Sequence, residues 1–241
     1  MYHKIKAIVL GVVRHSDRVD IVSLYTDRFG RMSVVTPAGG SSRTARMRRA
    51  SLMPLSVIET DINIHPERQL QQLGRFTSVR PNSGICGNPV KSAVAIFTAE
   101  FIGRALREQE PDPNLWQFLD TSIAVLDHSP APANFHLAFM AQLTRLVGIV
   151  PDIADYTPDA TFDMREGRYV DHTPPHSDIL FGVEARFPVL LSKLNYANYH
   201  RWRLPAATRR AILTGMITYY AIHLPGVEKL NSLDILRQLF Q

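Results

Sequence analysis

The chain has 241 residues, of which 45% are apolar and 20% are charged, a balance that is typical of globular proteins and excludes a disordered chain. Its apolar runs, such as residues 7–13, are too short to cross a bilayer, and no signal-peptide pattern opens the sequence. Cys86 is the only cysteine, which excludes an intramolecular disulfide and a thiolate metal cage. We therefore expect a cytoplasmic protein with no membrane partner.

The charge is unevenly distributed along the chain. Residues 1–80 contain 13 Lys and Arg against 6 Asp and Glu, whereas residues 81–241 contain 14 against 16. The positive field of the protein, whose formal net charge is +5, therefore belongs to its N-terminal third. Such an asymmetry indicates nucleic acid or another anionic surface as the partner of that third.

The first 80 residues have the pattern of a run of short β-strands. Apolar alternation and β-branched residues predict strands over residues 4–13, 19–26, 31–36, 55–60 and 69–79. On the first strand, Ile8, Leu10 and Val12 are expected on one face, with Val9 and Val13 on the other. Residues 27–30 predict a tight hairpin turn in which Gly30 adopts a positive φ. Five short strands with a basic face predict a five-stranded barrel of the OB-fold type.

A cluster of arginines follows the third predicted strand. It comprises Arg43, Arg46, Arg48 and Arg49, which contain no acid among them and are preceded by Gly39, Gly40, Ser41 and Ser42. Like charges this close repel one another, so they stay in solvent unless an anion binds them. We interpret residues 39–54 as a flexible basic loop that binds a polyanion, in preference to a merely solvated loop.

Further cations lie on or beside the predicted strands and extend this candidate DNA-binding track. They are Lys6, Arg14, Arg28 and Arg31. The alternative is that half of the arginines pair with Asp17, Asp20 or Asp27 and only keep the domain soluble.

From Pro81 onward the pattern turns helical. Apolar residues at three- and four-residue spacing predict helices over residues 90–102, 115–126 and 135–146. Pro205 is expected to begin a fourth helix, and Ser232 to cap a fifth. Residues 150–188 form an excursion with a hairpin that pairs 161–164 with 168–170. The sequence thus predicts an α+β protein with a β domain over residues 1–80 and an α-helical domain over residues 81–241.

Aromatic and basic residues alternate ahead of the fourth predicted helix. Tyr199, Arg201, Trp202 and Arg203 form a candidate secondary DNA contact, in which a ring stacks on a base and an arginine holds a phosphate. Large aromatics mostly serve protein cores, so an aromatic plug between helices is the favoured interpretation.

Several segments, taken in order, resemble the RecO family of bacterial recombination mediators. They are residues 7–10, 25–31, 39–49, 52–54, 139–148 with Pro151, 223–224, 229–232 and 236–240. The resemblance implies an N-terminal OB-fold followed by an α-helical domain, binding of single- and double-stranded DNA, and annealing of complementary strands without ATP. It also implies a nucleoid-associated protein that assists RecA loading. The implied partners are RecR and the acidic C-terminal tail of single-stranded DNA-binding protein.

The excursion departs from the family pattern. Many members carry four zinc-binding cysteines there, and residues 150–188 contain none. His172 and His176 are present with Asp171 and Asp178 nearby, but two prolines between the histidines prevent the helix that would place both imidazoles on one face. A zinc site needs about four well-placed ligands, so we expect no metal and no cofactor.

An acidic peptide with an apolar end requires an apolar helical groove with a cation at its mouth. The third predicted helix offers a candidate in Phe139 and Leu143, with Arg145 beside them. Core packing explains Phe139 and Leu143 equally well.

No catalytic residues are expected, since the histidines and carboxylates form no recognisable acid–base pair. The leading hypothesis is a DNA-binding recombination mediator, whose strand annealing requires charge neutralisation and no catalytic group. The alternative is an adaptor whose helical domain binds protein partners and whose basic segment contacts nucleic acid only weakly. A hydrolase comes third.

Overall fold

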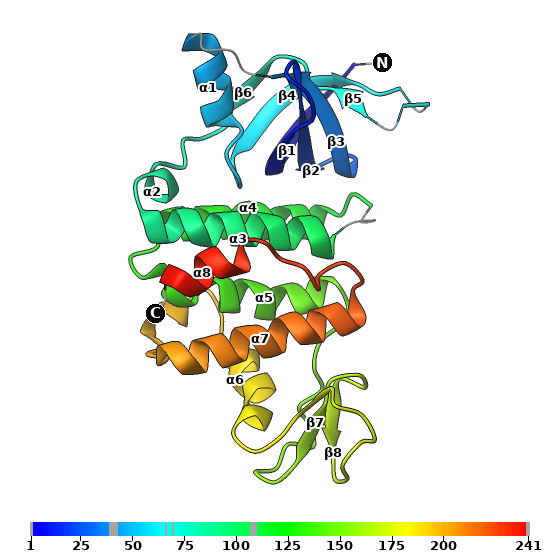
Figure 1. Cartoon of the computed structure of the whole chain (residues 1–241), viewed down its shortest axis with the longest axis vertical. Helices are drawn as coiled ribbons and strands as arrows, with labels where there is room; N and C mark the ends of the chain where they lie inside the picture. Colours follow the sequence, from blue (N-terminus) through cyan, green and yellow to red (C-terminus); the bar gives the residue numbers. More distant parts are fainter. Residues whose placement is uncertain (1, 39–42, 66, 69, 107–109, 240–241) are drawn as a thin grey trace. The chain divides into compact units, whose positions relative to one another are not determined.

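The computed structural model describes residues 2–38, 43–65, 67–68, 70–106 and 110–239. The chain divides into two compact units, Met1–His128 and Ser129–Gln241. The first contains a curled β-sheet and helices, and the second is mainly helical with a small sheet (Figure 1), so the predicted α+β class is confirmed. The first unit also includes three helices beyond residue 80, where we expect the β domain to end; that boundary stays a prediction.

The N-terminal unit begins with three antiparallel strands. Its elements are β1 (Tyr2–Arg14), β2 (Val19–Thr26), β3 (Gly30–Pro37), α1 (Arg43–Ser51), β4 (Val57–Asn63), β5 (Gln71–Gln72), β6 (Phe76–Ser78), α2 (Ser83–Cys86), α3 (Pro89–Ala105) and α4 (Pro113–His128). The predicted turn before β3 is confirmed, because Gly30 has a φ of 59°. The Thr26 hydroxyl fixes this turn by donating to the Gly30 carbonyl and accepting the Phe29 N–H, both at 3.0 Å.

The six strands curl into a half-barrel. Their order is β5-β3-β2-β1-β4-β6, so that β5 and β6 lie at opposite edges although only residues 73–75 separate them in the chain. Four residue steps span at most about 14 Å, which forces the two edges towards each other. The Leu73 N–H donates to the Val35 carbonyl, and the Thr60 hydroxyl donates to the Arg75 carbonyl, both at 2.9 Å. This closure is the arrangement expected of an OB-type barrel.

The prediction of one continuous strand over residues 69–79 is wrong. Its first residue, Gln69, lies outside the described residues, and the rest forms the two short strands β5 and β6. Gly74 marks the break, since a Cβ there would lie 2.9 Å from the Asp61 carbonyl oxygen. The sheet therefore has six strands in place of the predicted five.

The inner face of the curled sheet is the core of this unit. Ile5, Ala7 and Val9 of β1 pack there with residues from the neighbouring strands. The β1–β2 register shifts between Val9 and Gly11, which reverses the alternation beyond that point. Val12 consequently pairs with the core residue Val22 and joins the face of Val9, which corrects the predicted face assignment.

The outer face of the sheet is covered by α3 and α4. Tyr25 of β2 stacks on Trp116 of α4 at 6.5 Å between ring centroids, and both rings belong to the N-terminal unit. The Arg31 guanidinium donates to the Gly103 carbonyl of α3. Gly103 also lets α3 approach β1 closely, because a Cβ there would meet the Leu10 side chain at 3.9 Å.

The C-terminal unit contains the remaining predicted helices. Its elements are the 3₁₀ turn η1 (Pro132–Asn134), α5 (Phe135–Leu146), β7 (Thr161–Asp163), β8 (Arg168–Val170), β9 (Ile179–Leu180), η2 (Glu184–Arg186), α6 (Phe187–Lys193), η3 (Tyr199–Arg201), α7 (Ala206–His223) and α8 (Leu233–Leu239). The predicted hairpin is confirmed as β7–β8, with Gly167 at a φ of 68°. The short helices α2 and α6 were not predicted.

A buried carboxylate holds the excursion together. Asp163 at the end of β7 is 3% exposed, and its Oδ1 accepts the N–H groups of Arg165 and Glu166 at 2.8 and 3.1 Å. Its Oδ2 lies 3.3 Å from Nε2 of His176. His176 thereby ties the segment beyond β8 back to the hairpin.

Replacing His176 by alanine is expected to loosen this excursion, because it removes the contact to Oδ2 of the buried Asp163 carboxylate. Losing such a contact costs about 1–3 kcal/mol. Hydrogen exchange of the Phe162 and Tyr169 amides measures the opening. His172→Ala is the matched control, since His172 is exposed and its Nδ1 lies 3.3 Å from the likewise exposed Asp171 carboxylate. Equal exchange in both variants would contradict a bracing role for His176.

Candidate nucleic-acid interface

The arginine cluster forms a helix, which corrects the predicted loop. Arg43–Ser51 is α1, with no acid in its first turn and with Arg48 and Arg49 in its last. At about 100° per residue, Arg43, Arg46 and Arg49 follow one side of the helix. Gly39–Ser42, which we interpreted as a flexible approach to the ligand, lie outside the described residues.

The charge on α1 is poorly compensated. Arg43, Arg46 and Arg49 are exposed, whereas Arg48 is half-buried, with its guanidinium 5.9 Å from the centroid of the Phe76 ring. Within the described residues, no carboxylate forms an ion pair with Arg43, Arg46 or Arg48. Because like charges on one helix destabilise it, an anion that bridges them stabilises α1.

A hollow of about 360 Å³ lies between α1 and the open end of the curled sheet. Its residues are Val12, Arg14, Asp20, Thr36, Pro37, Arg48, Arg49, Leu52, Met53 and Pro54. The hollow joins Arg14 to the arginines of α1. Sequence reasoning did not place Thr36 at this site and considered Asp20 only as an ion-pair partner of arginines, because cross-strand pairing brings both residues into a row with Arg14. Met53 lies within the segment 39–54 that was predicted to bind a polyanion.

The eight candidate DNA-binding cations fall into two groups. Arg14 lines the same hollow as Arg48 and Arg49 of α1. Its Nε is 2.8 Å from Asp20 Oδ1, an ion pair of the kind that the alternative interpretation of the arginines predicts. Lys6 and Arg28 are exposed near the β2–β3 turn, where the Asp27 N–H donates to the Lys6 carbonyl at 3.1 Å. Along β1, Lys6 and Arg14 are about 26 Å apart. Arg31 lies at the same end of the sheet, beside the β2–β3 turn, but its guanidinium donates to the Gly103 carbonyl of α3.

The candidate secondary contact divides between a buried tyrosine and exposed arginines. Tyr199 is 3% exposed, and its hydroxyl donates to Ser129 Oγ at 2.6 Å. Its ring packs edge-on against Phe135 at 6.0 Å, so it serves the core and is not free to stack on a base. Trp202 is half-buried, whereas Arg201 and Arg203 are exposed. Tyr199 therefore fits the interpretation as an aromatic plug between helices.

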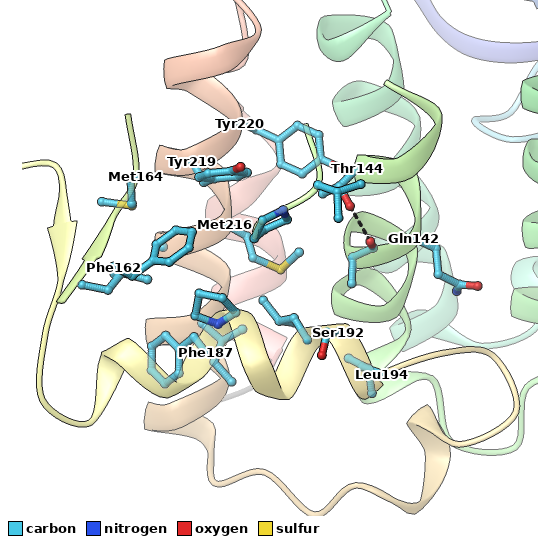
Figure 2. A pocket seen from close by; sticks show the side chains of 18 of the residues that line it. Gln142, Thr144, Phe162, Met164, Phe187, Ser192, Leu194, Met216, Tyr219 and Tyr220 are labelled. Atoms are coloured by element: carbon cyan, nitrogen blue, oxygen red, sulfur yellow. Dashed lines mark hydrogen bonds between the residues drawn. The ribbon is translucent and has the colours of Figure 1, made fainter. Parts of the chain in front are cut away.

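A second, apolar pocket of about 140 Å³ lies within the C-terminal unit. Aromatic and thioether side chains of β7, α6 and α7 converge on it, as Figure 2 shows for Phe162, Phe187 and Met216. One wall is α5, which contributes Ala141, Gln142, Thr144 and Arg145. Phe139 and Leu143 do not line it, because they are buried on the other side of α5 at 1% and 0% exposure. Of the predicted groove residues, Arg145 alone reaches the pocket.

The polar groups around this pocket are mostly occupied. The Tyr219 hydroxyl donates to the Ile149 carbonyl at 3.1 Å, and the Tyr220 hydroxyl donates to the Met140 carbonyl at 2.7 Å. Burial raises the pKa of Tyr219 to about 12 and raises the pKa of Tyr220 as well, so both stay neutral. Arg145 is exposed at the edge, which leaves an apolar pocket with a cation beside it.

The described part of the chain contains neither a metal-binding cluster nor a membrane-spanning helix. No three His, Cys, Asp or Glu side chains among the described residues gather closely enough to hold a metal ion. None of the helices described is long and apolar enough to span a membrane.

Comparison with known sequences places the chain in a family. Residues 1–82 match the family described as Recombination protein O N terminal, and residues 86–234 match Recombination protein O C terminal. The chain belongs to the RecO family. Similar proteins named DNA repair protein RecO occur in Azobacteroides pseudotrichonymphae, with 32% identity, and in Phocaeicola vulgatus, with 34%, each over 241 residues and 100% of both chains. The RecO protein of Bacteroides fragilis is 34% identical over 242 residues, again over 100% of both chains.

Membership of the RecO family confirms the resemblance found in the sequence and the assignment to DNA repair. The two matched segments meet between residues 82 and 86, close to the end of β6. The N-terminal segment therefore corresponds to the curled sheet with α1, which carries the basic surface.

Proposed function

We propose that this protein is a DNA-binding recombination mediator that anneals complementary single strands without ATP and assists RecA loading together with RecR. The observation that carries the proposal is α1, a helix with four arginines and no acid beside the open end of an OB-type sheet. Single- and double-stranded DNA are the proposed ligands, which would associate the protein with the nucleoid.

Annealing on this surface is a matter of charge. Two strands repel each other along their phosphates, and a cationic surface that holds both lowers that repulsion while the bases remain free to pair. Arg43, Arg46 and Arg49 on one side of α1 supply the first contacts, with Arg14 at the neighbouring strand end. Lys6 and Arg28 at the other end of the sheet form a separate contact for a second segment of DNA, next to Arg31, whose guanidinium is engaged by α3. Arg201 and Arg203 remain the exposed candidates in the C-terminal unit.

Annealing of two labelled complementary oligonucleotides in the absence of ATP tests this function. The protein is expected to accelerate annealing, and the variant with Arg43, Arg46, Arg48 and Arg49 replaced by alanine is expected to lose the acceleration. The adaptor hypothesis predicts the opposite pattern for the parent protein, namely partner binding with no DNA affinity and no acceleration.

The pocket of the C-terminal unit supports a peptide partner. We propose that it takes the apolar end of the acidic C-terminal tail of single-stranded DNA-binding protein, with Arg145 beside the peptide's carboxylates. In this proposal the peptide contacts the side of α5 opposite to Phe139 and Leu143, and Arg145 keeps its predicted role.

Replacing Arg145 by glutamate is expected to weaken binding of a synthetic tail peptide by about tenfold or more, because an attraction becomes a repulsion at the pocket edge. Calorimetry with the peptide measures the change. Arg203→Glu is the control, since Arg203 is exposed in the same unit but does not line the pocket. An equal loss of peptide affinity in both variants would show that binding depends only on the net charge of the protein.

A further inference from the structure

We propose that the hollow at the open end of the curled sheet holds one unstacked base of a single DNA strand. The inference rests on the proposed DNA binding and adds the part of the strand that is recognised. OB-type sheets bind strands along a basic surface, and the mouth of such a barrel is a frequent ligand site.

The floor of the hollow is a row of three polar residues on adjacent strands. Arg14 pairs with Asp20 across β1 and β2, and Asp20 pairs with Thr36 across β2 and β3. Direct cross-strand partners lie on the same face of a sheet. The register shift in β1 turns Arg14 towards this face, where its guanidinium compensates the charge of Asp20 at 2.8 Å. The Asp20 carboxylate therefore does not repel the phosphates of an approaching DNA strand.

Thr36 gives the hollow a hydrogen-bonding group that nothing in the described chain uses. Its side chain is 3% exposed, and its hydroxyl has no hydrogen-bond partner among the described residues. Buried hydroxyls are nearly always hydrogen-bonded, so an unsatisfied one that lines a hollow indicates a missing polar partner.

The walls of the hollow are apolar. Leu52, Pro37 and Pro54 line it, and Val12 and Met53 at the rim are 42% and 48% exposed. Its volume of about 360 Å³ is near the lower end of the range of roughly 300–1,000 Å³ that is usual for ligand pockets.

A nucleobase matches this combination of surfaces. Its flat faces suit apolar walls, its polar edge offers donors and acceptors to Thr36, and the phosphates on either side reach Arg48 and Arg49 of α1. An aliphatic ligand would leave the Thr36 hydroxyl unsatisfied. A free anion would leave the walls exposed.

A base site of this kind selects single strands. Bases in a duplex are paired and stacked, and they enter such a hollow only after being extruded at a cost in unstacking. The structure therefore predicts tighter binding of single strands than of duplex at equal phosphate number, with little dependence on sequence.

The experiment compares an oligothymidylate with an abasic strand of the same length, which carries the same phosphates. Fluorescence anisotropy gives both affinities for the full-length protein. The wild type is expected to prefer the thymidylate by about tenfold, as is typical for one well-held base. Val12→Trp fills the hollow and is expected to bring this ratio close to one. Val13→Trp is the matched control, since Val13 is the next residue on β1, is 67% exposed and does not line the hollow.

Thr36→Val tests the hydrogen bond by itself. Valine keeps the shape of threonine and removes only a hydroxyl that has no hydrogen-bond partner among the described residues, so none of the described hydrogen bonds is lost. The ratio of the affinity for the oligothymidylate to the affinity for the abasic strand is expected to fall by about threefold, as for the loss of one hydrogen bond.

Two results would overturn the base site: a wild-type ratio of one, or equal ratios for Val12→Trp and Val13→Trp. Affinity for the abasic strand reports phosphate binding separately, and its retention shows that each variant is folded. Failure of the wild type to bind either strand would instead overturn the proposed DNA-binding function.

Discussion

Replacing Arg43, Arg46, Arg48 and Arg49 together by alanine is expected to lower the affinity for single-stranded DNA by about 10²–10³-fold at about 0.1 M salt. Each phosphate contact on a single strand releases counterions, which contributes about 0.7 to the slope of log K against log salt. Three or four lost contacts therefore remove about two to three decades of affinity at that salt concentration. Fluorescence anisotropy with a labelled oligonucleotide measures the loss.

The control for this variant removes equal charge from the C-terminal unit. Arg186, Lys193, Lys229 and Arg237 are all exposed there, and their joint replacement by alanine gives the same net charge. Exposed charges that do not contact phosphates are largely screened at about 0.1 M salt, so this variant is expected to lose less than about threefold. If both variants lost the same affinity, DNA binding would follow net charge and α1 would have no special role.

Acid is expected to destabilise the C-terminal unit through His136. This side chain of α5 is fully buried, and burial, together with the positive charge of Arg209, lowers its pKa from 6.5 to about 3. The folded protein therefore keeps His136 neutral, whereas the unfolded chain takes up a proton once the pH falls below 6.5. The free energy of unfolding is expected to fall by about 1.4 kcal/mol per pH unit below that point, over the range down to the folded pKa.

His136→Gln isolates this contribution, because glutamine does not titrate. Urea unfolding at pH 7, 6 and 5 gives the free energy of unfolding of both proteins. The wild type and the variant are expected to differ less at pH 5 than at pH 6, by about 1.4 kcal/mol. His200→Gln controls for the loss of an imidazole as such, since His200 is exposed. A constant difference between wild type and His136→Gln across the pH range would show that His136 is not held neutral.

The local features of the fold could be predicted from the sequence. β2 runs over Val19–Thr26 and α5 over Phe135–Leu146, as predicted, because each follows one clear hydrophobic period. The turn at Gly30 was predicted with its positive φ, which glycine adopts without strain. The hairpin of residues 161–170 was predicted as well, and it turns at Gly167. Local patterning decided all of these features.

The features that depend on contacts between distant residues could not be predicted. The isolated Gly11 is the one sequence signal of the register shift after Val9. It does not specify which strands pair, yet the shift decides that Arg14 faces the hollow with Asp20 and Thr36. Similarly, an apolar stripe on α5 does not tell which side faces the core and which faces a pocket, so Phe139 and Leu143 were placed in a groove.

The helix α1 is a different case, because its signal was present. Alanine, methionine and arginine are good helix formers, and they make up most of residues 43–50. The repulsion among the arginines and the glycines ahead of them favour a loop, which is why the segment was predicted as one. Helical periodicity then explains why three of the arginines share one side.

The most direct test of the proposal that α1 holds DNA phosphates is a salt titration of DNA binding by the wild type and by the quadruple alanine variant. For four to six contacts, the wild type should give a slope of about −3 to −4 on single strands. The slope of the variant should be flatter by about 2 to 3. A variant slope equal to that of the wild type would contradict the proposal, because the phosphates would then be bound elsewhere on the protein.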